Sequence, residues 1–120
     1  MSIEQLAETA QAMVAPGKGI IAIDESTATC AKRFAGVGID NTEENRRRYR
    51  ELLLTTPNLS QHISGAILFD ETIRQSTKDG VPFAKYMLDN GMIPGIKVDK
   101  GTHNLAGFPG EVVTEGLDGL

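Results

Sequence analysis

The length, composition and charge of the chain limit its function before any motif is considered. Its 120 residues suffice for one small domain, and 40% hydrophobic with 23% charged residues is typical of a folded globular protein. A net charge of −4 offers no surface suited to nucleic acid or to an anionic membrane, although a few local cations can still bind a small anion. The N-terminus has no basic start and no long apolar run, so we expect a cytoplasmic protein without a signal peptide or membrane span.

The beginning of the chain predicts a helix, a buried strand and a second helix. Ser2-Ile3-Glu4-Gln5 has the form of a capping box, and apolar residues at helical spacing follow it until Pro16-Gly17 ends the helix. The apolar run 19–23 shows no alternation, which is typical of a strand covered on both faces in a parallel sheet. Residues 28–34 predict a short helix.

A further helix is predicted after Asn41-Thr42, because these two polar caps precede two glutamates near the positive end of the helix dipole. We expect its inward face to hold Tyr49, Leu52 and Leu53. The arginine-rich stretch 46–50 lies on the same helix. We interpret it as an exposed face balanced by neighbouring glutamates and not as a binding patch.

The second half of the chain continues the alternation of strands and helices. The apolar run 65–69 predicts a strand, residues 82–90 predict a helix that Gly91 ends, and residues 92–98 predict a third strand. The residues that follow are rich in glycine and show little periodicity. The order predicts an α/β fold with parallel strands near 19–24, 65–69 and 92–98, and the functional site of such a sheet lies at the carboxyl ends of its strands.

Asp24 is the first candidate for chemistry, because it directly follows an apolar strand. A carboxylate at the rim of a sheet is partly desolvated, and it can exchange protons with a substrate or accept hydrogen bonds from its hydroxyl groups. Aspartates after strands also often cap the next segment. The local sequence favours neither interpretation.

Lys97 is the second candidate, and it shares one face of the third strand with Asp99 because side chains alternate along a strand. A cation at the end of a buried strand suits phosphate binding or Schiff-base chemistry. The alternative, which local sequence favours, is a lysine that extends from the sheet edge and pairs with Asp99.

The remaining polar features are weaker. Lys32 and Arg33 follow two threonines near a helix start, where they could bind a phosphate or could equally form a solvated face. The single cysteine, Cys30, excludes an internal disulfide, and we interpret it as a buried structural thiol. His62 and His103 lie in unlike contexts without metal-ligand spacing, so no metal site is expected.

Five blocks of the sequence carry a resemblance to a known family. They are residues 22–27, 41–46, 67–72, 95–101 and 116–120. Together, in this order, they resemble class I fructose-bisphosphate aldolase of the kind found in animals, plants and some bacteria. The resemblance implies the N-terminal part of a (β/α)₈ TIM barrel. It also implies a lyase of glycolysis and gluconeogenesis that reversibly cleaves fructose 1,6-bisphosphate to dihydroxyacetone phosphate and glyceraldehyde 3-phosphate.

The resemblance further implies roles for five residues. Asp24 matches the strand-end aspartate that contacts the substrate hydroxyls and assists carbon–carbon cleavage, and Lys97 matches the lysine that binds the phosphate distant from the Schiff base. Ser26, Thr29 and Arg33 match the loop and helix near that phosphate, with Thr29 where the family often has serine. The implied mechanism needs no metal or other cofactor, because a lysine forms a protonated imine with the ketose. The implied partners are a phosphorylated ketose and further copies of the chain in a tetramer.

In the family, the Schiff-base lysine, the acid–base glutamate, another active-site lysine and the arginine for the other phosphate lie beyond the position that matches residue 120. We therefore expect residues 1–120 to be the N-terminal part of a single aldolase barrel domain, truncated at the C-terminus and inactive alone. Two alternatives stay open: a non-catalytic piece that binds phosphosugars or supports assembly, and a small flavodoxin-like α/β binding module. Irregular spacing between the strands disfavours the module.

Overall fold

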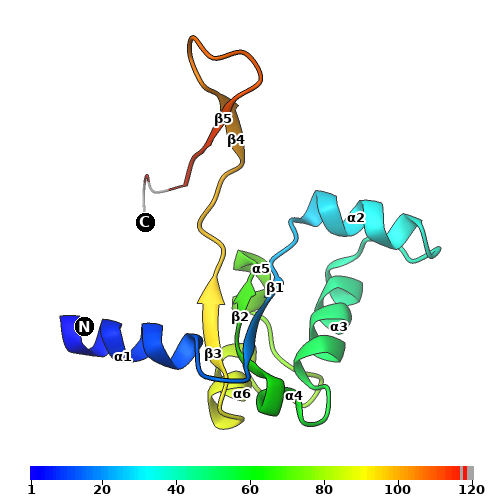
Figure 1. Cartoon of the computed structure of the whole chain (residues 1–120). Helices are drawn as coiled ribbons and strands as arrows, with labels where there is room; N and C mark the ends of the chain where they lie inside the picture. The colour runs from blue at the N-terminus through cyan, green and yellow to red at the C-terminus, as the bar shows by residue number, and fades with distance from the viewer. Residues whose placement is uncertain (117, 119–120) are drawn as a thin grey trace.

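The computed structural model describes residues 1–116 and 118, and it contains short strands that alternate with helices (Figure 1). The helices are α1 (Ile3–Met13), α2 (Thr27–Ala35), α3 (Glu43–Leu54), α4 (Leu59–His62), α5 (Asp70–Ile73) and α6 (Phe83–Asp89). The strands are β1 (Gly19–Ile23), β2 (Ile63–Leu68), β3 (Ile93–Ile96), β4 (Thr102–Asn104) and β5 (Val112–Thr114). No helix in the described part of the chain is long and apolar enough to cross a membrane.

The three longest apolar runs form one parallel sheet in the order β1-β2-β3. Ile23 lies opposite Leu68, and Leu68 lies opposite Ile96, so the carboxyl ends of the strands are level with one another. The predicted parallel α/β arrangement is therefore confirmed. The strand boundaries differ by a few residues: β2 begins earlier than predicted, and β3 ends at Ile96, although the amide of Lys97 still donates to the carbonyl of Leu68 at 2.8 Å.

Polar caps begin the three longest helices, as their sequences indicate. Ser2 and Gln5 form the predicted capping box of α1, and the hydroxyl oxygens of Ser26 and Thr42 accept from backbone amides in the first turns of α2 and α3. After the C-terminal end of α6, Gly91 has the predicted left-handed conformation, with a φ of 74°.

The predicted inward face of α3 is wrong at one position. Leu52 is 70% exposed, whereas Arg50 and Leu54 are both 1% exposed. The buried stripe follows the i, i+4 spacing of Arg46, Arg50 and Leu54, which places Leu52 on the opposite side of the helix. An arginine, Arg50, thus lies on the inward face, where it was not predicted.

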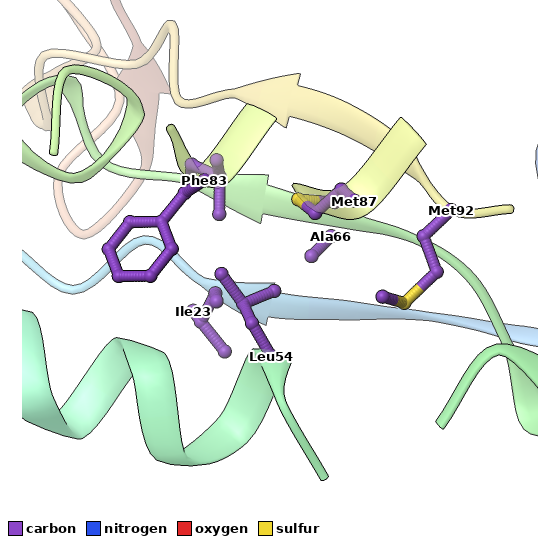
Figure 2. Packing of buried hydrophobic residues seen from close by; sticks show 7 residues of the cluster. Ile23, Leu54, Ala66, Phe83, Met87 and Met92 are labelled. Atoms are coloured by element: carbon purple, nitrogen blue, oxygen red, sulfur yellow. The ribbon is translucent and has the colours of Figure 1, made fainter. Parts of the chain in front are cut away.

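The hydrophobic core lies on the face of the sheet that α3 and α6 cover. Figure 2 shows Phe83 and Met87 from α6 and Leu54 from the end of α3 packed toward strand residues Ile23 and Ala66. Leu68 and Met92 complete this cluster of buried residues. Burial of large apolar side chains here fixes the helices against the sheet and so sets the position of the turns that follow β1 and β2.

The C-terminal segment, whose sequence shows little periodicity, contains two short strands. β4 and β5 pair in an antiparallel hairpin, with His103 opposite Val113, and the hairpin extends away from the sheet (Figure 1). Strands of three residues are too short to give a periodic pattern, and the glycines at 101, 107 and 110 have positive φ angles that mark turns.

We predict that the 120-residue polypeptide, expressed alone, self-associates or lacks fixed tertiary packing. Among the described residues, β1 and β3 each have one unpaired edge in the parallel sheet, and Ile20 and Ile96 on these strands are 44% and 41% exposed. Light scattering and near-ultraviolet circular dichroism test this. A monomer with one cooperative unfolding transition would contradict the prediction.

Candidate active site

The polar residues that follow β1 and β3 meet at the carboxyl edge of the sheet. The Nζ atom of Lys97 lies 3.2 Å from Oδ2 of Asp24, and it also donates to the carboxylate of Asp99. The side chains of Asp24 and Lys97 are 23% and 24% exposed, so both are partly withdrawn from water. The ion pair with Asp99 that the local sequence favours is present, and Asp24 joins it from the far side of β2.

The two carboxylates stabilise the charged form of the lysine. Hydrogen bonding to Asp99 is the largest cause that raises the pKa of Lys97 above its ordinary value of 10.5. Burial opposes this increase, and hydrogen bonding to Asp24 adds to it to a lesser extent. In return, the ammonium group of Lys97 lowers the pKa of Asp99 below 3.8. The ion pair of Lys97 with Asp99 therefore stabilises the fold fully between the ordinary pKa values of 3.8 and 10.5. This stability is lost as pH falls through the lowered pKa of Asp99 or rises through the raised pKa of Lys97.

Four of the five predicted site residues line one hollow of about 660 Å³ at this edge: Asp24, Ser26, Thr29 and Lys97. Its other polar side chains include Asp70, Asp99 and Lys100. A larger hollow of about 1000 Å³ lies between α3 and the segment 77–81, and none of the five residues lines it. We take the smaller hollow as the candidate site, because the strand-end charges converge there.

Ser26 and Thr29 stand at the start of α2. The amide of Thr29 donates to Oγ of Ser26 at 3.3 Å, and the two hydroxyl oxygens lie 3.1 Å apart. Ser26 therefore has a capping role that needs no ligand. Because the amides of a helix start also favour an anion, the same two hydroxyls can contribute to a phosphate site beside Lys97.

Arg33 does not line this hollow. It is 58% exposed, and its guanidinium pairs with the carboxylate of Glu25, which is only 9% exposed. The sequence places Arg33 near the two threonines, but it does not indicate that Arg33 forms an ion pair with Glu25.

Glu25 is the centre of a buried polar group, and sequence reasoning missed it. Nη2 of Arg50 donates to the backbone carbonyl of Glu25 at 2.8 Å and lies 3.2 Å from its Oε2, and the hydroxyl of Tyr49 donates to Oε1 at 3.1 Å. Nη1 of Arg50 also contacts Sγ of Cys30 at 3.3 Å. Cys30 is buried, as predicted, since this residue has no exposed surface.

The interpretation of the arginine-rich stretch 46–50 as a solvated face is therefore wrong for two of its members. Arg50 is buried, and Arg46 forms two hydrogen bonds of 2.7 and 2.8 Å with the carboxylate of Glu71. Arg47 does pair within the helix, with Glu44 and Glu51. The i, i+4 spacing of Arg46 and Arg50 with Leu54 was the available signal of the buried stripe.

The histidines stay outside the site. His103 lies in β4 of the hairpin, where its Nε2 is 3.3 Å from the carboxylate of Glu115. Within residues 1–116 and 118, no group of three histidine, cysteine, aspartate or glutamate side chains is arranged to hold a metal ion.

Comparison with known proteins decides the family of the chain. The sequence model for the glycolytic fructose-bisphosphate aldolase class I family matches residues 5–120. The chain belongs to the class I fructose-bisphosphate aldolase family. It is 86% identical over all of its 120 residues to the probable fructose-bisphosphate aldolase class 1 of Xanthomonas campestris pv. campestris, of which it covers 36%. It is 55% identical over 117 residues to the cytosolic fructose-bisphosphate aldolase 7 of Arabidopsis thaliana, of which it covers 33%.

A solved aldolase structure confirms the fold. The fructose-bisphosphate aldolase of Plasmodium falciparum, solved in complex with TRAP and a small molecule inhibitor, superimposes with a TM-score of 0.89 at 52% sequence identity. The match covers 97% of this chain and 33% of that one. The prediction of an α/β chain with the N-terminal part of a (β/α)₈ barrel is confirmed. The chain spans about a third of the length of the aldolases that it matches.

We predict that Asp99→Asn lowers the pKa of Lys97, because hydrogen bonding to Asp99 is the largest cause of its increase. Lys97 should then react with a trace acylating reagent at lower pH than in the unchanged protein, as measured by mass spectrometry across an alkaline pH series. Lys18, before β1, provides the internal reference. An unchanged profile for Lys97 would show that Asp99 does not hold the ammonium group in solution.

Proposed function

We propose that the chain provides the N-terminal third of a class I aldolase that reversibly cleaves fructose 1,6-bisphosphate to dihydroxyacetone phosphate and glyceraldehyde 3-phosphate. The contact of 3.2 Å between Lys97 and Asp24, inside the hollow at the sheet edge, is the observation that carries the proposal. It joins a cation suited to phosphate and a carboxylate suited to hydroxyl groups, and it occurs in a chain of this family. The imine-forming lysine is proposed to lie outside these 120 residues.

In this proposal, Asp24 is the catalytic residue of the chain. Cleavage between two hydroxyl-bearing carbons requires a base for a hydroxyl proton and a group that orients it. A carboxylate that is 23% exposed beside an ammonium group can accept hydrogen bonds from the hydroxyls and assist that proton transfer. The electron pair of the broken bond passes to the protonated imine, which forms outside this chain.

Lys97, Ser26 and Thr29 are proposed to bind the substrate phosphate distant from the imine. Lys97 supplies the charge, and the helix start supplies hydroxyls and favours a negative group. Arg33 is proposed as an outer contact, which must first leave Glu25 or bind phosphate while paired with it. A piece that binds phosphosugars without turnover is the alternative that the same residues allow, and the experiments below separate the two.

Two further properties belong to this proposal. A homotetramer is proposed from the family resemblance, and light scattering of the complete protein tests it. A cytoplasmic location is proposed as well. The names of two relatives from Arabidopsis thaliana differ in this respect, one being cytosolic and the other chloroplastic.

We predict that the 120-residue chain alone neither cleaves fructose 1,6-bisphosphate nor forms an imine with dihydroxyacetone phosphate. Lys97 is held charged by two carboxylates, and a protonated amine is not a nucleophile. Borohydride reduction followed by mass measurement tests this, with the protein translated from the complete reading frame as positive control. A stable adduct on Lys97 or Lys100 of the short chain would contradict the assigned roles.

We predict that Asp24→Asn and Lys97→Met have different kinetic effects in the complete enzyme. Asp24→Asn keeps the shape but removes the proton acceptor, so kcat should fall by about 10²- to 10⁴-fold. Lys97→Met removes a phosphate contact that exists before and during the reaction, so KM should rise more than kcat falls. Lys85→Met is the matched control, since Lys85 is an exposed residue of α6 paired with Asp89. The opposite division of effects would show that the two roles are reversed.

A further inference from the structure

We propose that Arg50 is a positioning residue, whose guanidinium fixes the turn between β1 and α2 (residues 24–26, the β1–α2 turn) and so keeps Asp24 opposite Lys97. The kinetic consequence of this inference rests on the proposed function. The structural part does not, because it concerns only contacts between α3 and the turn.

One guanidinium reaches three points around the turn. Nη2 of Arg50 donates to the backbone carbonyl of Glu25 at 2.8 Å and lies 3.2 Å from the carboxylate of the same residue. Nη1 contacts Sγ of Cys30, in the first turns of α2, at 3.3 Å. The backbone of the turn, its side chain and the helix that follows are thus held by one group that is 1% exposed.

These contacts lie directly next to the proposed catalytic group. Glu25 is the neighbour of Asp24, and it precedes Ser26, which caps α2. A hydrogen bond to the carbonyl of Glu25 fixes the peptide unit between Glu25 and Ser26, and this unit begins one residue after Asp24. Displacement of a reacting group by about 1 Å can reduce turnover by about a hundredfold, so the position of this peptide unit matters for Asp24.

The chemistry of Arg50 suits positioning better than simple packing. A planar fork can contact several acceptors in fixed directions, which an ammonium group cannot do. The ring of Tyr49 lies 4.9 Å from the Arg50 guanidinium, and its hydroxyl donates to Oε1 of Glu25 at 3.1 Å, so the adjacent residue of α3 supports the same carboxylate. An apolar side chain could fill this space, but it could not hold the turn in a fixed orientation.

Arg50→Lys in the complete protein is the test, because lysine keeps the charge beside Glu25 and loses the fork. We expect kcat to fall by about 10- to 100-fold. In an Asp24→Asn background, where the group to be positioned is already impaired, we expect the same substitution to lower kcat by less than about twofold. Arg48→Lys, an exposed arginine of the same helix, should leave both backgrounds unchanged.

Non-additivity separates positioning from a general structural role. Equal losses in the two backgrounds, or no loss in either, would overturn the proposal. If Arg50→Lys does not fold, the double variant Glu25→Gln/Arg50→Gln removes both buried charges together, and it should lose kcat in the same non-additive way.

Hydrogen exchange provides a readout that needs no reaction. The amides of residues 25–30 should exchange faster in Arg50→Lys than in Arg48→Lys, while those of β2 keep their protection. Unchanged exchange in residues 25–30 would overturn the proposal even if kcat falls. If the complete protein shows no aldolase turnover, the proposed function fails, and the exchange experiment still decides whether Arg50 holds the turn.

Discussion

The parallel register of β1, β2 and β3 is the constraint on which the candidate site depends. Ile23, Leu68 and Ile96 are level across the sheet, so the residues that follow them emerge together at one edge. Asp24 and Lys97 are 73 positions apart in the sequence, yet they are in contact. Asp24 follows β1 and Lys97 follows β3, and these two strands flank β2. An antiparallel β3 would place Lys97 at the opposite edge. The chemistry of the site thus follows from the direction of the strands before it follows from any side chain.

The helix α3 connects this edge to the packed interior. Arg50 contacts Glu25 after β1, and Arg46, one turn earlier on the same stripe, contacts Glu71 after β2. The Arg50–Glu25 pair is almost fully buried, whereas the side chains of Arg46 and Glu71 are 11% and 25% exposed. Removal of one partner of a fully buried pair destabilises a protein by about 3–5 kcal/mol, whereas an apolar replacement of the whole pair is often neutral. Stability alone therefore does not account for two arginines on the inward stripe. Their directed contacts with two consecutive strand ends do.

The sequence predicted the sheet better than it predicted the site. Continuous apolar runs such as 19–23 require burial on both faces, and helix caps such as Ser2 and Thr42 act over a few residues, so both can be recognised locally. Burial of Arg50 was missed, because an arginine in a charged stretch is ordinarily solvated. Its spacing from Leu54 was the one local signal, and its partner Glu25 is 25 residues away. The incorrect prediction that Leu52 faces inward has the same cause. The hairpin of β4 and β5 was missed because three-residue strands carry no period.

The charges of the hollow determine how a phosphate can enter it. The ammonium group of Lys97 has three N–H donors, and it already donates to the carboxylates of Asp24 and Asp99. Its raised pKa keeps the cation charged when the anion arrives, but a phosphate must compete with these carboxylates for the ammonium group. The side chain of Asp99 is 40% exposed and that of Asp24 is 23% exposed, so Asp99 turns toward water more readily than Asp24. In the proposed enzyme, binding of phosphate at Lys97 weakens the hold of that lysine on Asp24. The carboxylate of Asp24 then becomes free to accept a hydrogen bond from a substrate hydroxyl, so occupation of the phosphate site prepares the group that assists cleavage.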